Sequence, residues 1–201
     1  MKIVHVFHNY YPAIGGMERA VQGLAEEQAK MGHEVHVITS TLGSRGSLRK
    51  EDVINDVYVH RVRTIRFHYP DLTYPMEYPK ELLKDTDIVH CHSQNSLFSV
   101  MIAEKAKKFG AKVIFYFMAV DALVNHPSKL VRLIGSCYSR KNTWKVIKLA
   151  DLILTKSLRD QEILEIRYKV KSIYLPDGLP DYYFTIPKTD SEEFRRKFNI
   201  K

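Results

Sequence analysis

Two histidines placed two residues apart, His90 and His92, are the first residues whose type and spacing could do chemistry. They end the apolar run 87–92, which predicts a buried strand, so both side chains project to one face. Imidazole can move protons, ligate a metal or bond hydroxyl groups. As metal ligands the pair lacks partners, so no metal site is expected. Ser93 and Asn95 follow and could bind ligand hydroxyls, although either histidine could instead be a structural residue satisfied in the core.

A second candidate is the adjacent glycine pair Gly15 and Gly16. It separates the apolar run 3–7 from an amphipathic segment that closes at Gly32, which predicts a strand, a loop and a helix. Backbone N–H groups and the positive end of the helix dipole would face a ligand there, and phosphate suits that geometry. The alternative is a plain tight turn. Glu18 could contact the ligand or simply interact favourably with the dipole.

Motifs of other nucleotide-binding proteins do not occur. A dinucleotide fingerprint needs G-x-G-x-x-G at the first turn and an acidic residue after the second strand. The turn has only its glycine pair, and the second apolar run ends Ile38-Thr39-Ser40. No Gly-Lys-Ser or Gly-Lys-Thr is found. The sequence therefore disfavours dinucleotide-dependent oxidoreductases and P-loop NTPases.

The elements that must position these residues alternate between strand and helix. Strands are expected at 3–7, 35–38, 57–62, 87–92, 113–117, 152–155 and 171–175, and helices before Gly32 and at 79–84, 97–109, 128–149, 157–168 and 191–198. Loops are expected at 41–56, 66–78 and 176–187, and the helix 128–149 could break near Gly135. This order predicts a doubly wound, mainly parallel, Rossmann-like α/β domain with ligands beyond the carboxyl ends of its strands.

Length and composition fit one globular domain. The 201 residues are 45% hydrophobic and 27% charged, and no apolar window is long enough for a membrane span. The chain starts directly with a strand, so no signal peptide is expected. Two cysteines are poor material for a disulfide framework. The expected location is cytoplasmic.

The net charge of +8 is concentrated in one segment. From Lys129 to Lys148 the chain has six basic residues and no acidic one. This segment could face an anionic membrane, with a solvated basic face as the alternative. A nucleic-acid partner would rest on charge alone and is not expected. The aromatic residues Phe67, Tyr69, Tyr74 and Tyr78 could form a sugar-stacking wall or anchor their Pro-rich loop.

Several short motifs, taken in order, carry a family resemblance. They are Tyr11-Pro12, Gly15-Gly16-Met17-Glu18, Gly32-His33-Glu34-Val35, Asp87-Ile88-Val89-His90-Cys91-His92, Leu154-Thr155-Lys156-Ser157, Leu175-Pro176-Asp177-Gly178 and Phe184. Together they resemble the amino-terminal half of retaining GT-B glycosyltransferases of family 4. The motifs span nearly the whole chain.

The resemblance implies a transferase that moves a sugar from a nucleoside-diphosphate sugar to a carbohydrate or lipid-linked acceptor. Residues 1–186 would be the acceptor-side domain, and 187–201 a linker or the start of the carboxyl-terminal donor-binding domain, without which the chain would be inactive. Such enzymes as a rule use no metal or other cofactor, because helix N-termini and basic side chains neutralise the diphosphate. The alternative is a stand-alone, non-catalytic carbohydrate-binding or scaffold domain.

The resemblance also implies residue roles. Gly15, Gly16 and Glu18 would form the donor-phosphate loop. From their types and positions, the candidate acceptor-binding residues are His90, His92, Ser93, Asn95 and Tyr74.

One position departs from the family pattern. After the strand 113–117 most members have a histidine at the catalytic centre, and Met118 stands there in this chain. Asp121 or His126 could take over by a shift of the loop. The chemistry could instead tolerate the loss, or the active site could have degenerated.

Overall fold

The computed structural model describes residues 1–42, 48–67, 72–178, 182–185 and 188–200. One sheet has the strand order β10-β9-β8-β7-β1-β2-β4-β3, and all its neighbours pair in parallel except β3 and β4. Its strands are β1 Lys2–Val6, β2 Glu34–Ser40, β3 Glu51–Ile54, β4 Val57–Val62, β7 Ile88–His92, β8 Lys112–Phe117, β9 Leu152–Thr155 and β10 Ile173–Tyr174. The expected mainly parallel, Rossmann-like sheet is confirmed.

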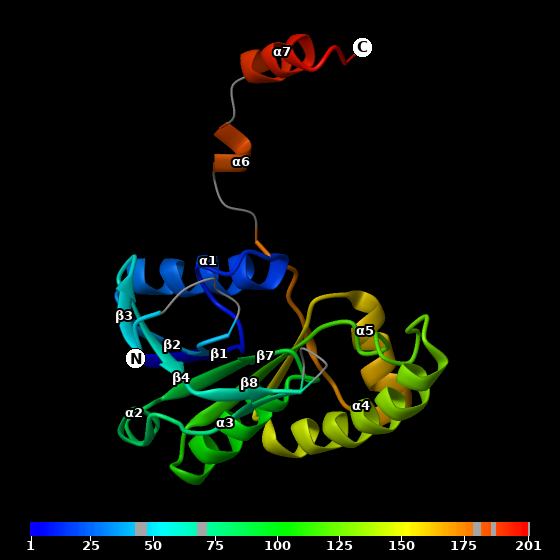
Figure 1. Ribbon diagram of the computed structural model, residues 1–201. Coiled ribbons are helices and arrows are strands. Elements are labelled where there is room, and N and C mark those ends of the chain that lie inside the picture. The colour runs from blue at the N-terminus through cyan, green and yellow to red at the C-terminus, as the bar shows by residue number, and fades with distance from the viewer. Residues whose placement is uncertain (43–47, 68–71, 179–181, 186–187, 201) are drawn as a thin grey trace.

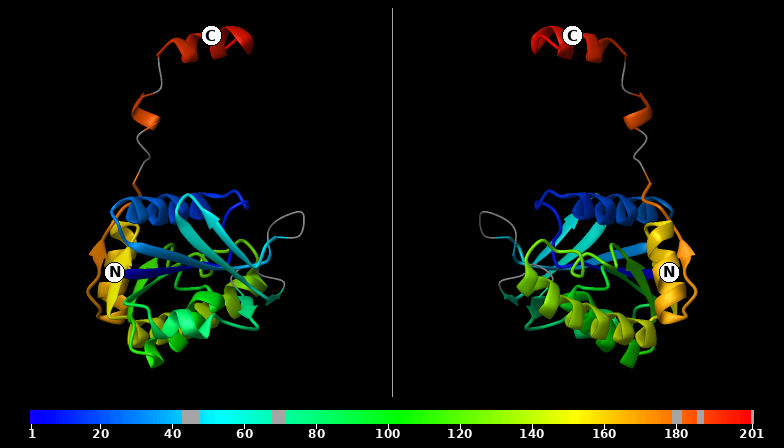
Figure 2. Two further views of the ribbon diagram at one scale, coloured as in Figure 1. Left: turned by 90° about the vertical axis from the view of Figure 1, so that its left-hand side faces the viewer. Right: turned by 90° about the vertical axis from the view of Figure 1, so that its right-hand side faces the viewer.

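Helices cover both faces of this sheet, with α1 on one face and α2, α3 and α4 on the other (Figure 1, Figure 2). Their bounds are α1 Gly16–Lys30, α2 Lys80–Lys84, α3 Leu97–Lys108, α4 Lys129–Leu149, α5 Leu158–Ile163 with the π-helical turn η2 Leu164–Tyr168, α6 Tyr182–Thr185 and α7 Lys188–Lys197. Apolar side chains form two clusters. The larger joins the central strands to α3 and α5, and the smaller packs α1 on β2 and β4.

The strand order reverses at β1, which lies between β2 and β7. The chain leaves β1 toward β2 in one direction, and leaves β7 toward β8 in the other. In doubly wound sheets ligands bind in the crevice outside such a switch point. Two loops flank it here, residues 7–15 after β1 and residues 93–96 after β7.

Two of the expected loops contain strands. Part of 41–56 forms β3, which pairs with β4 through a turn at Asn55 and Asp56, both at positive φ (49° and 64°). Asparagine and aspartate tolerate this conformation and favour two-residue hairpins. The segment 66–78 contributes to a separate hairpin of β5 Thr64–Arg66 and β6 Thr73–Pro75. Residues 43–47 and 68–71, with Tyr69, lie outside the described part.

Three expectations about helices have clear outcomes. Helix α1 ends as expected, because Gly32 has φ +86° and its N–H bonds Ala29 O at 2.9 Å. Ser157 caps α5 by accepting from Asp160 N at 3.1 Å. The break near Gly135 is not found: α4 is continuous, and a methyl group at Gly135 would lie 3.1 Å from Leu123 Cβ. A small residue therefore lets this helix approach the loop before it.

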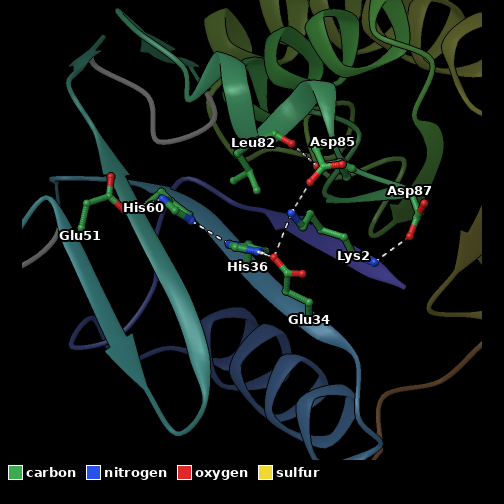
Figure 3. Close-up of polar contacts among 9 residues, drawn as sticks. Lys2, Glu34, His36, Glu51, His60, Leu82, Asp85 and Asp87 are labelled. Atoms are coloured by element: carbon green, nitrogen blue, oxygen red, sulfur yellow. Dashed lines mark hydrogen bonds and ion pairs between the residues drawn. The ribbon is translucent and has the colours of Figure 1, made fainter.

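A polar network crosses the sheet away from the switch point, and Figure 3 shows it running from β4 to β1. His60 and His36 share a hydrogen bond of 2.9 Å, and His36 Nε2 lies 3.0 Å from Glu34. Glu34 also pairs with Lys2 at 3.0 Å. At the other end, Glu51 contacts His60 at 2.5 Å. Each histidine of this network therefore has a carboxylate partner.

No helix among the described residues has the length and apolarity needed to cross a membrane. Helices α6 and α7 extend away from the sheet in Figure 1. The expected domain boundary falls on residues 186 and 187, which lie outside the described part, so that boundary stays a prediction.

Candidate functional site

The glycine turn begins α1 at the switch point. Gly15 is the N-cap with extended backbone, and no side chain caps the helix end. A methyl group at Gly15 would overlap the carboxylate of Glu18, which folds back over the turn, whereas one at Gly16 would meet no atom within 4 Å. The fold therefore does not itself require glycine at position 16. A carboxylate near the N-terminus also interacts favourably with the helix dipole, so Glu18 already has a structural role.

A buried arginine that sequence analysis missed holds this turn in place. Arg61 of β4 is 1% exposed. Its guanidinium donates to Tyr11 O at 3.1 Å, to Arg49 O at 3.1 Å and to Asp52 Oδ2 at 3.3 Å. The loop before α1 is thereby tied to the edge of the sheet.

The loop after β7 is buried and strained. Ser93 has φ +69°, a conformation that few non-glycine residues adopt, and Ser93 and Asn95 are 8% and 3% exposed. Asn95 Oδ1 accepts from Ser139 of α4 at 3.0 Å, and Asn95 O accepts from Tyr138 at 2.7 Å. These contacts hold α4 against the loop. The Asn95 side chain thus points into the protein rather than toward a ligand.

The loop after β8, which carries Met118, is clamped from two sides. Gln94 bonds both the N–H and the carbonyl of Met118, at 3.0 and 3.1 Å. The buried carboxylate of Asp160 accepts from the N–H groups of Ala119 and Val120 at 3.1 and 2.8 Å. Ala119 has φ +46°, so this clamp offsets the cost of an unfavourable backbone.

Asp121 and His126 lie on either side of the turn that leads into α4. The Asp121 carboxylate is 12% exposed and pairs with Arg167 at 2.8 Å and Arg159 at 3.7 Å. His126 Nδ1 accepts from Ser128 N at 3.2 Å. Both residues therefore already have structural partners.

His90 and His92 do share a face, as expected, and β1 adds a third histidine that the sequence analysis missed. His5 pairs with His90 in the β1–β7 register, and its Nδ1 lies 3.1 Å from His92 Nε2. All three rings are buried beneath α1, whose Gln28 accepts from His5 Nε2 at 2.7 Å. The expectation that His90 and His92 lack a partner is therefore wrong.

The histidine cluster is neutral near pH 7. Burial lowers the pKa of His5 to about 4 and that of His90 to about 3, and it holds the pKa of His92 well below its usual range. Because His5 Nε2 donates to Gln28, its Nδ1 is the acceptor for His92 Nε2–H. His92 Nδ1 and His90 Nε2 are then buried without a described hydrogen-bond partner. Each such atom costs about 1–3 kcal/mol.

Tyr74 does not join these residues in the main sheet. It lies on the β5–β6 hairpin and is 39% exposed. Tyr116 of β8 stands there instead, and its hydroxyl lies 2.9 Å from Asp177 Oδ1. Asp177 in turn pairs with Lys156. This contact holds the 175–178 turn at the carboxyl end of the sheet.

Some of the missed residues had a signal in the sequence. Asp160 follows the N-cap Ser157 by three residues, which is the acidic position of a capping box. His5, like His90, is a polar residue inside the apolar run of its strand, and this shared pattern is the signal. Gln94 and Arg61 had none, because their partners come from distant parts of the chain.

The comparisons with known proteins fit this architecture. The model of Glycosyltransferase Family 4 matches residues 14–175. The uncharacterized glycosyltransferase MJ1607 of Methanocaldococcus jannaschii is 39% identical over 101 residues, which are 46% of this chain and 25% of that protein.

Solved structures share the fold at low identity. Sucrose-phosphate synthase from Thermosynechococcus elongatus has a TM-score of 0.69 at 15% identity, with 100% of this chain and 53% of that chain covered. WaaG, a glycosyltransferase involved in lipopolysaccharide biosynthesis, has a TM-score of 0.60 at 16% identity, with 99% and 52% covered. Anabaena HepE in complex with UDP has a TM-score of 0.59 at 15% identity, with 99% and 50% covered.

This chain thus spans about half the length of those structures and a quarter of the curated relative. The family match includes the glycine pair, α1 and the strands on both sides of the switch point. The chain belongs to Glycosyltransferase Family 4 and has the Rossmann-like fold of a GT-B glycosyltransferase.

Proposed function

We propose that this chain is the acceptor-side half of a retaining glycosyltransferase that uses a nucleoside-diphosphate sugar. The observation that carries the proposal is the uncapped N-terminus of α1 at the switch point, with open space at Gly16. Backbone N–H groups and the helix dipole there can stabilise the departing diphosphate. A second Rossmann-like domain would hold the rest of the donor.

Similar structures support the donor class. HepE was solved with UDP, and a trehalose-6-phosphate structure from E. coli was solved with UDP-2-fluoro glucose. That structure has a TM-score of 0.55 and 12% identity to this chain. On this proposal transfer needs no metal, so activity persists in excess chelator, and the product keeps the anomeric configuration of the donor.

The test is a donor and acceptor screen on the protein that joins this chain to its donor-binding half, followed by Gly16→Ala. A methyl group at Gly16 points into open space, so the fold tolerates it, but it blocks close approach of a diphosphate to the backbone. We expect kcat/KM to fall about 10- to 100-fold. Gly23→Ala is the matched control, because it adds a methyl group to open space on the same helix. Equal activity of both variants would contradict the proposed donor site.

We propose fewer direct contacts to the acceptor than the sequence analysis expected. His90, His92, Ser93 and Asn95 are 2–8% exposed, so we propose that they hold the loop 93–96, which we call the acceptor loop, in shape rather than contact the acceptor. Tyr74 is exposed and remains available for direct contact. A two-domain protein that binds sugars without transferring them would favour the non-catalytic alternative. Two observations motivate this test: Met118 stands at the position of the family histidine, and Asp121, its possible replacement, is ion-paired.

We further propose that the first half of α4 contacts an anionic membrane surface that carries a lipid-linked acceptor. Leu130, Leu133 and Ile134 occupy one side of the helix and are 66%, 70% and 62% exposed. The second half of α4 packs on the domain, and its Lys145 pairs with Glu104 at 3.0 Å. Lys129 and Arg132, the basic residues of the first half, lie in the same turns as these exposed apolar side chains. Basic and apolar side chains together suit a surface of anionic lipids.

Co-sedimentation with vesicles tests this contact. Vesicles containing phosphatidylglycerol should retain the protein, and pure phosphatidylcholine vesicles should retain much less. The double variant Leu133→Gln, Ile134→Gln should lose most of this binding. Ile166→Gln is the control, since Ile166 is 59% exposed outside α4. Equal retention of the double variant and the control would refute the contact.

A further inference from the structure

We propose that His5, His90 and His92 together bind one divalent transition-metal cation of the zinc type. The three residues come from adjacent strands at the switch point, and one ring nitrogen of each lies within 4.8 Å of the other two. This inference is independent of the proposed transfer reaction, in which the metal has no part. Its role is to cross-link β1 to β7 beneath the glycine turn.

The spacing of the rings suits a three-histidine site. Metal–nitrogen bonds of about 2.1 Å at tetrahedral angles separate ligand nitrogens by about 3.4 Å and ring centres by about 5 Å. The observed centroid distances are 5.2 Å for His5–His90, 5.4 Å for His5–His92 and 4.4 Å for His90–His92. The nitrogens of His5 and His92 are already 3.1 Å apart. Convergence on one ion requires the three rings, whose ligand nitrogens lie within 4.8 Å of one another, to turn about χ2.

The cluster has buried ring nitrogens that no described protein group bonds. His90 Nε2 and His92 Nδ1 have no hydrogen-bond partner among the described residues. The oxygen of Gln28 orients His5 from outside, as metal-ligating histidines require from a neighbouring group. Ligation through His5 Nδ1 and His92 Nε2 requires the proton shared between them to move to His92 Nδ1, whereas ligation through His92 Nδ1 leaves that hydrogen bond in place.

The second histidine network of this protein lacks these features. His36 Nδ1 and His60 Nε2 lie 2.9 Å apart, but Glu34 and Glu51 contact the remaining ring nitrogens of these two residues (Figure 3). Neither has a nitrogen left without a partner among the described residues. An all-nitrogen set favours Zn²⁺, Co²⁺, Ni²⁺ or Cu²⁺ over Mg²⁺ or Ca²⁺.

The experiment titrates the chelator-stripped protein with Co²⁺ and follows visible absorption. We expect one equivalent to bind with the intense bands of a tetrahedral site, Zn²⁺ to displace it, and Mg²⁺ to have no effect. Zn²⁺ at 100 times its Kd should raise the ratio of folded to unfolded protein about 100-fold, seen as a higher Tm. His90→Gln and His92→Gln should abolish the bands, whereas His60→Gln should retain them.

Long-range ¹H–¹⁵N spectra of the histidine rings keep the test decisive if the core variants do not fold. Zn²⁺ should shift one nitrogen in each of His5, His90 and His92 in the wild-type protein and leave His36 and His60 unchanged. Absence of a one-equivalent site, shifts confined to other histidines, or bands that survive in a folded His92→Gln variant would each overturn the proposal. Loss of metal binding would leave the transferase proposal standing, since that proposal is tested in the presence of chelator.

Discussion

Three buried polar residues hold the loops of the candidate site in place. Arg61, Gln94 and Asp160 each hold backbone groups of a loop at the carboxyl end of the sheet. Buried polar groups of this kind are stabilising only while every partner is present. Substitutions below the site should therefore be felt in both stability and loop geometry.

Arg61→Met is expected to destabilise the protein strongly. The substitution keeps most of the side-chain volume but leaves the Tyr11 and Arg49 carbonyls without their donor. We expect the free energy of unfolding to fall by about 2–4 kcal/mol, measured by urea denaturation. Arg63→Met, at an exposed neighbour, should change it by less than about 0.5 kcal/mol. Similar midpoints for both variants would show that the Arg61 contacts contribute little.

His8 is expected to make the metal-free protein sensitive to acid. Burial, with a smaller contribution from Arg66, lowers the pKa of His8 to about 4. As the pH falls, the unfolded chain takes up the proton first, so stability is fully present above pH 6.5 and is lost between pH 6.5 and 4. From pH 7.5 to 5.5 this residue alone should remove about 1.4 kcal/mol.

The measurement compares urea denaturation of wild type and His8→Gln at both pH values in chelator. The variant should lose less stability on acidification, by that amount. An identical pH dependence of the two proteins would mean that His8 does not titrate as its burial implies.

At the scale of elements, the first turn of α5 and the middle of α4 decide how the loops are held. Helix α5 presents Asp160 at its first turn to the loop after β8, and α4 receives the loop after β7 through Ser139 and Asn142. Strand, loop and helix thus form one connected unit around the switch point. Leu130, Leu133 and Ile134 in the first half of α4 stay exposed.

Asp160→Asn should loosen the loop after β8 specifically. An amide keeps only one acceptor atom, so one of the Ala119 and Val120 N–H groups loses its partner, at a cost of about 2 kcal/mol. Amide hydrogen exchange should accelerate at Ala119 and Val120. Ser157→Ala removes the cap of the same helix and the hydroxyl bond to Asp160 Oδ2, at about 1 kcal/mol, but keeps both acceptor oxygens for Ala119 and Val120. Matching exchange patterns in the two variants would argue against the clamp.

At the scale of the whole molecule, the switch point brings the glycine turn, the acceptor loop and the histidine cluster to one place. His8 links the first two, because its Nδ1 lies 3.3 Å from Ser96 Oγ. The chain covers about half of each solved structure described above. We propose that a donor-binding domain makes up the other half, so most donor contacts should come from there.

The 201-residue chain alone is therefore expected to show no sugar transfer and only weak affinity for nucleotides. The comparison is an activity assay and calorimetric titration with UDP on this chain and on the two-domain protein. Transfer should appear only in the latter, and nucleotide should bind it more tightly. Appreciable turnover by the chain alone would show that the division of labour proposed for the two halves is wrong.

The sequence by itself determined the order of strands and helices, the parallel sheet, the caps at Gly32 and Ser157, and the family. These follow from local periodicity, turn chemistry and motifs that are contiguous in the chain. It also placed His90 and His92 on one face, since a strand has a fixed period of two.

Only the tertiary structure decided which residues meet across the sheet. It added His5 to the histidine pair, buried Asn95 against α4, paired Asp121 with two arginines and left Leu133 exposed on α4. The hairpin of β3 and β4 is local instead, and its two-residue turn at Asn55 and Asp56 is a signal that the sequence itself carries. Register and packing join residues up to 93 positions apart, and no local pattern encodes such contacts.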